Sequence, residues 1–318
     1  MKEIGGYLEF ERNSGREFHA DAIPLNSGRN CLRYLLQANR IANILLPKLC
    51  CDAVFNVCKE ENVEIIFYDV NTRFEPILPT KKADKQWLYV VNTYGFLSGE
   101  KVSEMYGKGY EIIWDNSHAF FEKPLNGMHT LYTCRKYFGV PDGGYLYTKC
   151  LLEKDLPETK NNIHSMEHLL GRFEENAQNY YQAFQQNEER IEKEPLGMMS
   201  KYTQNILRGL DYDTILEIRR DNFEYLKKHL MDINELDLAD ANGTYMYPLL
   251  CKNGAKIRSE LQKRKIYVPC LWPNVACLEE KESTAVKLAQ NIVPLPIDQR
   301  YNEADMNYIV KMINEIIR

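Results

Sequence analysis

The alternation of short apolar runs with helical segments in the first 150 residues constrains the fold more than any other feature of this sequence. Runs with the length and composition of buried strands lie at 44–46, 63–68, 87–91, 111–114, 130–133 and 145–147. Segments with a helical spacing of apolar residues lie among them, at 29–42, 53–59 and 103–106. Strands that alternate with helices are typical of parallel βαβ units. We therefore predict an α/β fold with a mainly parallel sheet flanked by helices.

The pattern changes after residue 150. Residues 158–193 are polar and rich in Glu, Gln and Asn, which is typical of one or two exposed helices. Beyond them, helices are predicted at 202–210, 213–230, 255–263, 285–290 and 304–317, and strands at 245–250 and 266–268. We predict a large α/β domain over residues 1–210 and a smaller C-terminal α+β domain over residues 211–318.

Charge and composition exclude several classes of protein. Forty Lys and Arg stand against 45 Asp and Glu, with no basic block, so we predict no nucleic-acid partner. No apolar run approaches the roughly 20 residues of a membrane span, and the N-terminus lacks the apolar region of a signal peptide. We therefore predict no membrane partner. The nine cysteines include no C-x-x-C pair, which favours free thiols in a reducing compartment, the cytoplasm.

Polar residues follow the predicted strands, where open parallel sheets bind their ligands. They are Asn92, Asp115 and the stretch from Thr133 to Lys136. At the start of the first helix, Ser27 is a candidate N-cap, and Gly28 lets backbone N–H groups approach an anion that the helix dipole favours. Ser-Gly before a helix is also a common cap, so this pair alone leaves phosphate binding open.

A second motif lies in the polar region. Residues 164–168 match H-x-x-E-H, a zinc-protease pattern that places two histidines on one helix face. The segment lies beyond the predicted sheet, and no third-ligand motif follows it. We predict a solvated helix face there and no metal site.

Several of these motifs occur together, in the same order, in one known family. Ser27-Gly28-Arg29, Asp115-x-x-His118 and Lys136 followed by Gly143-Gly144 resemble the DegT/DnrJ/EryC1/StrS family of pyridoxal-phosphate-dependent sugar aminotransferases. Arg219-Arg220-x-Asn222 and Leu295-Pro296-Ile297 are also in the style of that family. The resemblance extends along nearly the whole chain. It implies the fold type I (aspartate-aminotransferase-like) architecture and pyridoxal 5′-phosphate as cofactor.

The resemblance also implies a role for each matching residue. Lys136 would form the Schiff base with the cofactor and move a proton during transfer. Asp115 would keep the pyridine nitrogen protonated, and His118 would bind the ring-hydroxyl oxygen and pack on the ring. Asn92 either reaches the same oxygen or only forms a turn. The cofactor phosphate would be held by Ser27, Gly28, Arg29 and Thr133.

The sequence departs from the family at three places. Cys51 stands where the family has an aromatic residue that stacks on the pyridine ring. Leu131 replaces the common Ser five residues before the Schiff-base lysine, which leaves Thr133 as the nearest hydroxyl. Residues 197–201 carry no Asn where many members supply one from the partner subunit. The cofactor pocket therefore resembles the family more closely than the substrate pocket does.

The resemblance implies an aminotransferase that moves an amino group from an amino acid donor, glutamate, to a keto sugar or a similar carbonyl acceptor. The alternative is a cofactor-binding protein of the same fold that acts as a scaffold or regulatory module. A homodimer is also implied. In it, Ser200 or Lys201 of segment 198–202 reaches the partner's cofactor phosphate, unless the segment packs in its own subunit.

Overall fold

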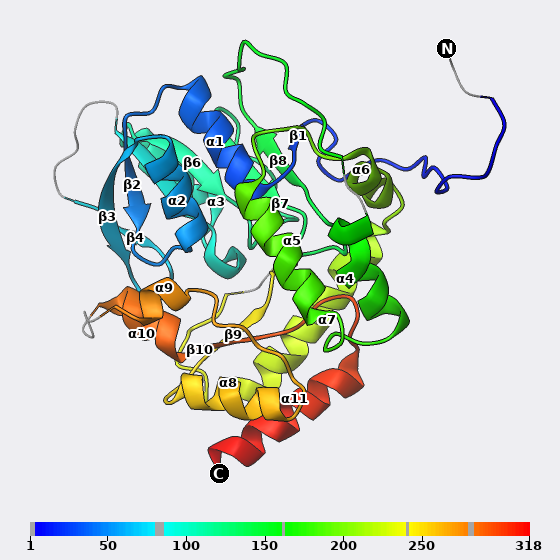
Figure 1. Cartoon of the computed structure of the whole chain (residues 1–318). Coiled ribbons are helices and arrows are strands. Elements are labelled where there is room, and N and C mark those ends of the chain that lie inside the picture. The colour runs from blue at the N-terminus through cyan, green and yellow to red at the C-terminus, as the bar shows by residue number, and fades with distance from the viewer. Residues whose placement is uncertain (1–3, 80–85, 161–162, 240–241, 279–282) are drawn as a thin grey trace.

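An eight-stranded sheet forms the body of the N-terminal half of the molecule (Figure 1). The computed structural model describes residues 4–79, 86–160, 163–239, 242–278 and 283–318. The strands are β1 (Ile23–Leu25), β2 (Asn43–Pro47), β3 (Glu64–Val70), β4 (Pro76–Ile77), β5 (Trp87–Val91), β6 (Glu111–Asp115), β7 (His129–Thr133) and β8 (Gly144–Tyr147). Their order is β1-β8-β7-β6-β5-β2-β3-β4. The five from β7 to β3 are parallel, which confirms the predicted mainly parallel sheet.

Helices follow the strands of this sheet and then extend beyond it. They are α1 (Gly28–Ala38), α2 (Asp52–Glu60), the 3-10 turn η1 (Thr93–Gly95), α3 (Gly99–Gly107), α4 (Ile163–Glu174), α5 (Tyr181–Lys193) and α6 (Lys201–Arg208). Helix α1 starts at Ser27, whose Oγ accepts a hydrogen bond from Asn30 N at 3.2 Å. The predicted helices at 53–59 and 103–106 are confirmed as α2 and α3.

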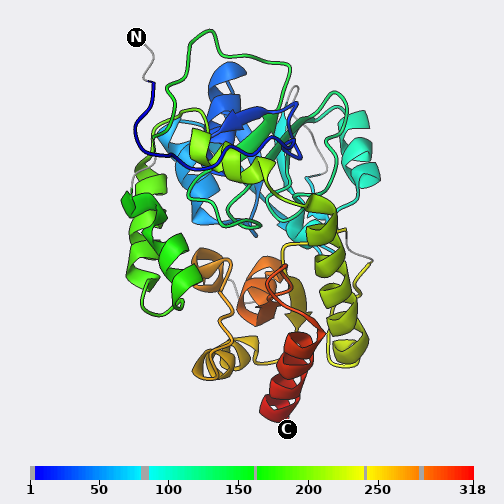
Figure 2. The same ribbon diagram turned by 90° about the vertical axis from the view of Figure 1, so that its right-hand side faces the viewer.

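The C-terminal part has a sheet of its own. Its elements are α7 (Tyr212–Leu230), β9 (Tyr247–Leu250), α8 (Gly254–Lys263), α9 (Pro273–Ala276), α10 (Thr284–Asn291), β10 (Ile292–Leu295) and α11 (Glu303–Ile317). Strands β9 and β10 pair antiparallel, and α7, α8 and α11 cover them. Helices α8 and α11 lie at the end of the molecule away from the large sheet, with α7 alongside (Figure 2).

Two predicted elements are wrong in extent or kind. The helix predicted at 29–42 ends at Ala38, because Arg40 adopts a left-handed φ of 50° and Ile41 N bonds back to Leu36 O at 3.0 Å. The strand predicted at 266–268 is absent from the described residues, although its side chains alternate between buried and exposed. The partner of β9 is instead β10, which includes Pro294 and which the sequence pattern did not predict.

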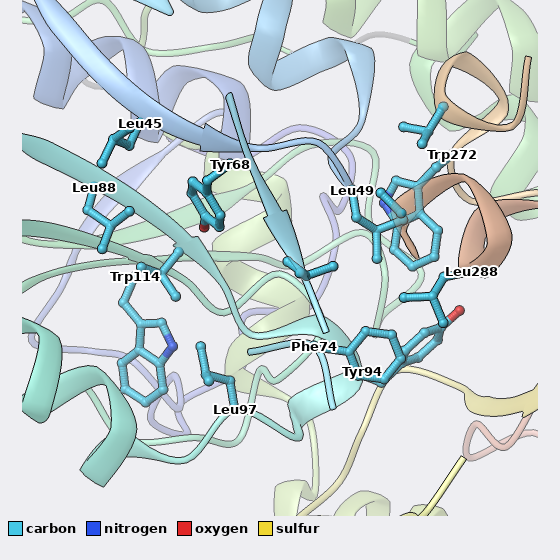
Figure 3. Close-up of a cluster of buried hydrophobic side chains, with 14 of the residues drawn as sticks. Leu45, Leu49, Tyr68, Phe74, Leu88, Tyr94, Leu97, Trp114, Trp272 and Leu288 are labelled. Atoms are coloured by element: carbon cyan, nitrogen blue, oxygen red, sulfur yellow. The ribbon is translucent and has the colours of Figure 1, made fainter. Parts of the chain in front are cut away.

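A buried cluster connects the two parts of the chain (Figure 3). Leu49, Phe74 and Tyr94 from the loops of the large sheet pack with Trp272 and Leu288 from the α9–α10 region. The α9–α10 region therefore packs against the large sheet rather than belonging to a separate body. The boundary between residues 210 and 211 stays a prediction. None of the helices in the described ranges is long and apolar enough to cross a membrane.

Candidate active site

The loops that follow β2, β5, β6 and β7 meet at one edge of the large sheet, because these strands are parallel. Strands β2 and β5 are neighbours at the centre of the sheet, but the next strands of the chain, β3 and β6, lie on opposite sides of this pair. The connections that leave β2 and β5 therefore run in opposite directions across the sheet. Ligands of open α/β sheets bind at such a point. The loops carry Cys51, Asn92, Asp115 with His118, and Thr133 with Lys136. The sequence prediction therefore places most of its site residues at this one edge.

The N-terminus of α1 forms a cradle for an anion beside Thr133. The first N–H groups of a helix have no partner inside the helix and point outward. A Cβ at Gly28 would lie 3.6 Å from Thr133 Cβ and 3.9 Å from Ser117 Oγ, so glycine leaves a small space between the two hydroxyl residues. The Nε atom of Arg29 is buried without a hydrogen-bond partner among the described residues. These features fit a bound phosphate group.

Gly143 and Gly144 hold this cradle against β8. Gly143 has a φ of 115°, a left-handed conformation, and its N–H donates to Asn26 O at 2.8 Å. A Cβ at Gly144 would lie 2.8 Å from Ser27 C and 2.9 Å from Gly28 N. Both neighbours are backbone atoms that cannot rotate away. The glycine pair after Lys136 therefore positions the start of α1.

We expect Gly144→Ala to push the start of α1 away from β8 and to weaken binding of the pyridoxal phosphate that the sequence resemblance implies by about tenfold or more, since overpacking typically costs about 1–3 kcal/mol. Binding is measured by absorbance titration of the protein with the cofactor. Gly139→Ala in the same loop is the matched control, because its Cβ meets only Leu169 Cδ2, at 3.9 Å. Equal affinity of the Gly144 variant and the wild type would contradict this role of Gly144.

Asp115 is fixed at the end of β6 by two donors. Its Oδ2 accepts from the Tyr89 hydroxyl at 2.7 Å and its Oδ1 from Ser117 N at 2.8 Å. The carboxyl group is buried, and burial together with the Asp115 charge raises the pKa of Tyr89 well above its usual value, so that hydroxyl stays a donor. Each carboxylate oxygen keeps further acceptor capacity. Asp115 therefore fits a cationic N–H group.

His118 is a buried imidazole in the loop that follows Asp115. Its Nδ1 accepts from Tyr94 N at 3.4 Å, which leaves the ring proton on Nε2. Burial, and then the charge of Lys136, lowers the pKa of His118 well below its usual value. Tyr94 holds a left-handed φ of 54° to present this N–H. His118 Nε2 is therefore a donor suited to an anionic oxygen.

Lys136 lies in the turn after β7 and is half-buried. Its Nζ lies 5.6 Å from the centre of the Tyr245 ring. In the part of the chain that the structure describes, the ammonium group has neither a hydrogen-bond acceptor nor an ion-pair partner. A partly buried charge without a partner is costly. A ligand whose carbonyl carbon bonds covalently to this amine would remove the cost of that charge. Lys136 therefore fits a Schiff-base lysine.

The side chains of Asn92 and Cys51 are both engaged within the chain. Asn92 donates to Asn116 Oδ1 at 2.9 Å and accepts from Leu97 N at 3.0 Å, so its contact with a ring oxygen stays a prediction. Cys51 is the N-cap of α2 and packs between two buried clusters. A hydrogen bond from Cys50, and also the charge of Lys136, lowers the pKa of the Cys51 thiol. Its stacking on the ring likewise stays a prediction.

Three residues of the site were missed by the sequence analysis. Tyr89 holds Asp115, Ser117 borders the phosphate cradle, and Tyr245 faces both Lys136 and His118, with ring centres of Tyr245 and His118 5.2 Å apart. Tyr245 comes from the segment before β9, far from the other residues in sequence, and no motif marked it.

Ser200 and Lys201, which were predicted to reach a partner subunit, contact residues of their own chain in this structure. Ser200 is the buried N-cap of α6, and its Oγ donates to Asp142 Oδ1 at 2.9 Å in the same chain, so its contact with a partner subunit stays a prediction. Lys201 pairs with Glu158 at 3.1 Å, and its contact with a partner stays a prediction.

In the H-x-x-E-H motif, His164 is exposed and His168 is buried, and the described residues contain no cluster of three metal-ligating side chains.

Comparison with known proteins rests on structure alone. No protein-family model matches the sequence, and no curated protein matches it. Among solved structures, a DegT DnrJ EryC1 StrS aminotransferase from Brucella abortus superposes with a TM-score of 0.62 at 15% identity, covering 92% of this chain and 85% of that one. The putative sugar aminotransferase Spr1654 from Streptococcus pneumoniae, in its PLP form, gives 0.67 at 13% identity, covering 93% and 86%.

Helicobacter pylori PseC, an aminotransferase involved in the biosynthesis of pseudoaminic acid, gives a TM-score of 0.64 at 15% identity, covering 93% of this chain and 86% of that one. These structures match over both parts of the chain, including the large sheet and the region after α7. At such low identities the likeness concerns the fold. The chain therefore has the fold type I architecture of the DegT/DnrJ/EryC1/StrS sugar aminotransferases.

Proposed function

We propose that this protein is a pyridoxal-phosphate-dependent aminotransferase. The observation that carries the proposal is the meeting of three features at one sheet edge: the open N-terminus of α1, the fixed carboxylate of Asp115, and the ammonium group of Lys136, which has no partner among the described residues. An anion site, an acceptor for a cationic ring nitrogen and a nucleophilic amine are the groups that this cofactor requires. The fold of the similar structures supports the same reading.

The residues that would hold the cofactor follow from the site. Gly28 and Arg29 of α1, with Thr133, would bind the phosphate, and Ser27 caps the helix that presents them. Asp115 would accept a hydrogen bond from the protonated pyridine nitrogen and so keep that nitrogen protonated. When bound, the cofactor supplies an electron sink that stabilises negative charge on the substrate carbon.

The protein's own groups would then move and hold protons. Lys136 Nζ, as a free amine, would take the proton from the substrate carbon that bears the amino group and return it later in the reaction. His118 Nε2 would donate to the ring oxygen without itself changing charge, because burial holds its pKa well below neutrality. Tyr89 would keep the Asp115 carboxylate oriented throughout.

We propose an amino acid, glutamate, as donor and a keto sugar or similar carbonyl compound as acceptor. Support for the sugar comes from the similar structures, which include sugar aminotransferases. The test is the absorption spectrum of the cofactor-loaded protein after addition of L-glutamate. A donor reaction removes the visible band, and a suitable keto acceptor restores it. A band unchanged by any amino acid would refute the transferase and favour the cofactor-binding scaffold.

We also propose that the protein is a cytoplasmic homodimer. All nine cysteines are free, as a reducing compartment requires. Two-fold dimers are the commonest homo-oligomers. Light scattering of the loaded protein at micromolar concentration should give twice the mass of one chain, and the mass of a single chain would contradict the dimer.

A further inference from the structure

Arg219 is fully buried in the middle of α7 and binds three separate segments of the chain. Its Nη1 donates to Thr244 O at 3.2 Å and to Tyr245 O at 3.3 Å, and its Nη2 lies 3.5 Å from Tyr137 O. Its Nε donates to Gln299 Oε1 at 3.1 Å. The guanidinium group is therefore satisfied by carbonyl oxygens rather than by a carboxylate.

Two of these segments carry the residues that face each other in the active site. Tyr137 directly follows Lys136, and its ring packs against Arg219 with 4.5 Å between the guanidinium carbon and the ring centre. Gln299 Nε2 donates to the same Tyr137 O at 2.8 Å, so Arg219 and Gln299 both bind the backbone of the Lys136–Tyr137 turn. Tyr245 presents its ring to Lys136 at 5.6 Å.

The Tyr245 segment is also tied to His118, because Tyr245 N donates to His118 O at 3.2 Å. One buried cation thus fixes the turn of Lys136 and the segment before β9 that brings Tyr245 and the His118 loop together. Burial of a guanidinium group is costly, and it lowers the pKa of Arg219. Such a group persists in a core where its hydrogen bonds hold a required arrangement.

We propose that Arg219 is a positioning residue for Lys136. It fixes the Lys136–Tyr137 turn relative to the Tyr245 ring, so that the amine and the aromatic face keep one arrangement. The effect on the cofactor rests on the proposed function, whereas the effect on the two segments does not. Arg220, the next residue on α7, is exposed, and within the described residues its guanidinium group bonds only to the Asn242 side chain, so it offers a matched control.

The first experiment uses the protein without cofactor and measures amide hydrogen exchange in Arg219→Met, Arg219→Lys and Arg220→Met. We expect exchange at the Tyr245 amide and at residues 134–138 to rise by about tenfold or more in Arg219→Met, less in Arg219→Lys, and not at all in Arg220→Met. Strand β5 should exchange as in the wild type. Equal acceleration in β5 would show a general loss of stability and overturn the positioning role, as would unchanged exchange at both segments.

The second experiment uses the cofactor-loaded protein. Circular dichroism of the bound cofactor reports its orientation, and we expect its amplitude to fall in Arg219→Met and to recover partly in Arg219→Lys. The value of kcat should fall by about 10- to 100-fold with a smaller change in KM, because misplacement of a reacting group acts on the chemical step. An unchanged spectrum and kcat would overturn the proposal. If the wild type binds no cofactor, the proposed function fails, and the exchange experiment still decides the role of Arg219.

Discussion

Lys136→Ala is expected to abolish covalent attachment of pyridoxal phosphate and to leave the fold intact. Lys136 is half-buried and its ammonium group makes no hydrogen bond to the described residues, so truncation opens little core volume. The free energy of unfolding should change by less than about 1 kcal/mol. The measurement is borohydride reduction of the loaded protein, followed by mass analysis of its peptides.

The control for this experiment is Lys123→Ala, which removes an exposed lysine from the loop after His118 and should keep attachment at the wild-type level. Cofactor mass on a peptide that lacks Lys136 would refute the assignment. So would undiminished attachment in the Lys136 variant. Either result would leave the fold described above unaffected and would remove the chemical role of the amine.

Asp115→Asn is expected to lower kcat/KM by about 100- to 1000-fold, the range seen when one preorganised electrostatic group is removed. The substitution keeps the volume but replaces an acceptor with an NH2 group. That group cannot accept from a protonated ring nitrogen, and it also opposes one of the two donors, Tyr89 or Ser117, that now hold the carboxylate. Steady-state rates with glutamate as donor measure the effect.

Tyr89→Phe is the companion variant, because it keeps the carboxylate and removes one donor to it. We expect a loss of about tenfold, well short of the loss for Asp115→Asn, in line with about 1.5 kcal/mol for a hydrogen bond to a charged group. A rate for Asp115→Asn within about threefold of the wild type would show that this carboxylate does not act on the cofactor ring.

The fold was predictable where burial was continuous along the sequence. Strand β5 lies where its apolar run predicted it, because a central parallel strand is covered on both faces and needs no alternation. The run at 266–268 has the alternation of a strand but pairs with no strand in the described ranges, and pairing depends on residues distant in sequence. Strand β1 was missed for the same reason, since its three residues become a strand only beside β8.

The site residues likewise divide into those that local sequence predicts and those that depend on contacts between distant segments. Asp115 and Lys136 follow predicted strands, so their common location came from the rule for strand ends, whereas Ser27 was predicted as the cap of the first helix. Tyr245 and Arg219 act through contacts between the large sheet and the C-terminal part. No local pattern encodes such contacts. A buried arginine in the middle of an amphipathic helix is indistinguishable in sequence from an exposed one.

The pairing of β1 with β8 has a consequence for how the protein acquires its ligand. This edge pairing joins residues 25 and 144 and carries the start of α1 with it. Contacts between such distant residues require closure of a long loop and form slowly during folding. The start of α1, and the anion cradle with it, therefore depends on an edge pairing that we expect to form late in folding. A cofactor that binds only when β1 is paired with β8 would shift the pairing equilibrium toward the paired state by mass action. The edge of the sheet would then open less often in the loaded protein than in the free protein.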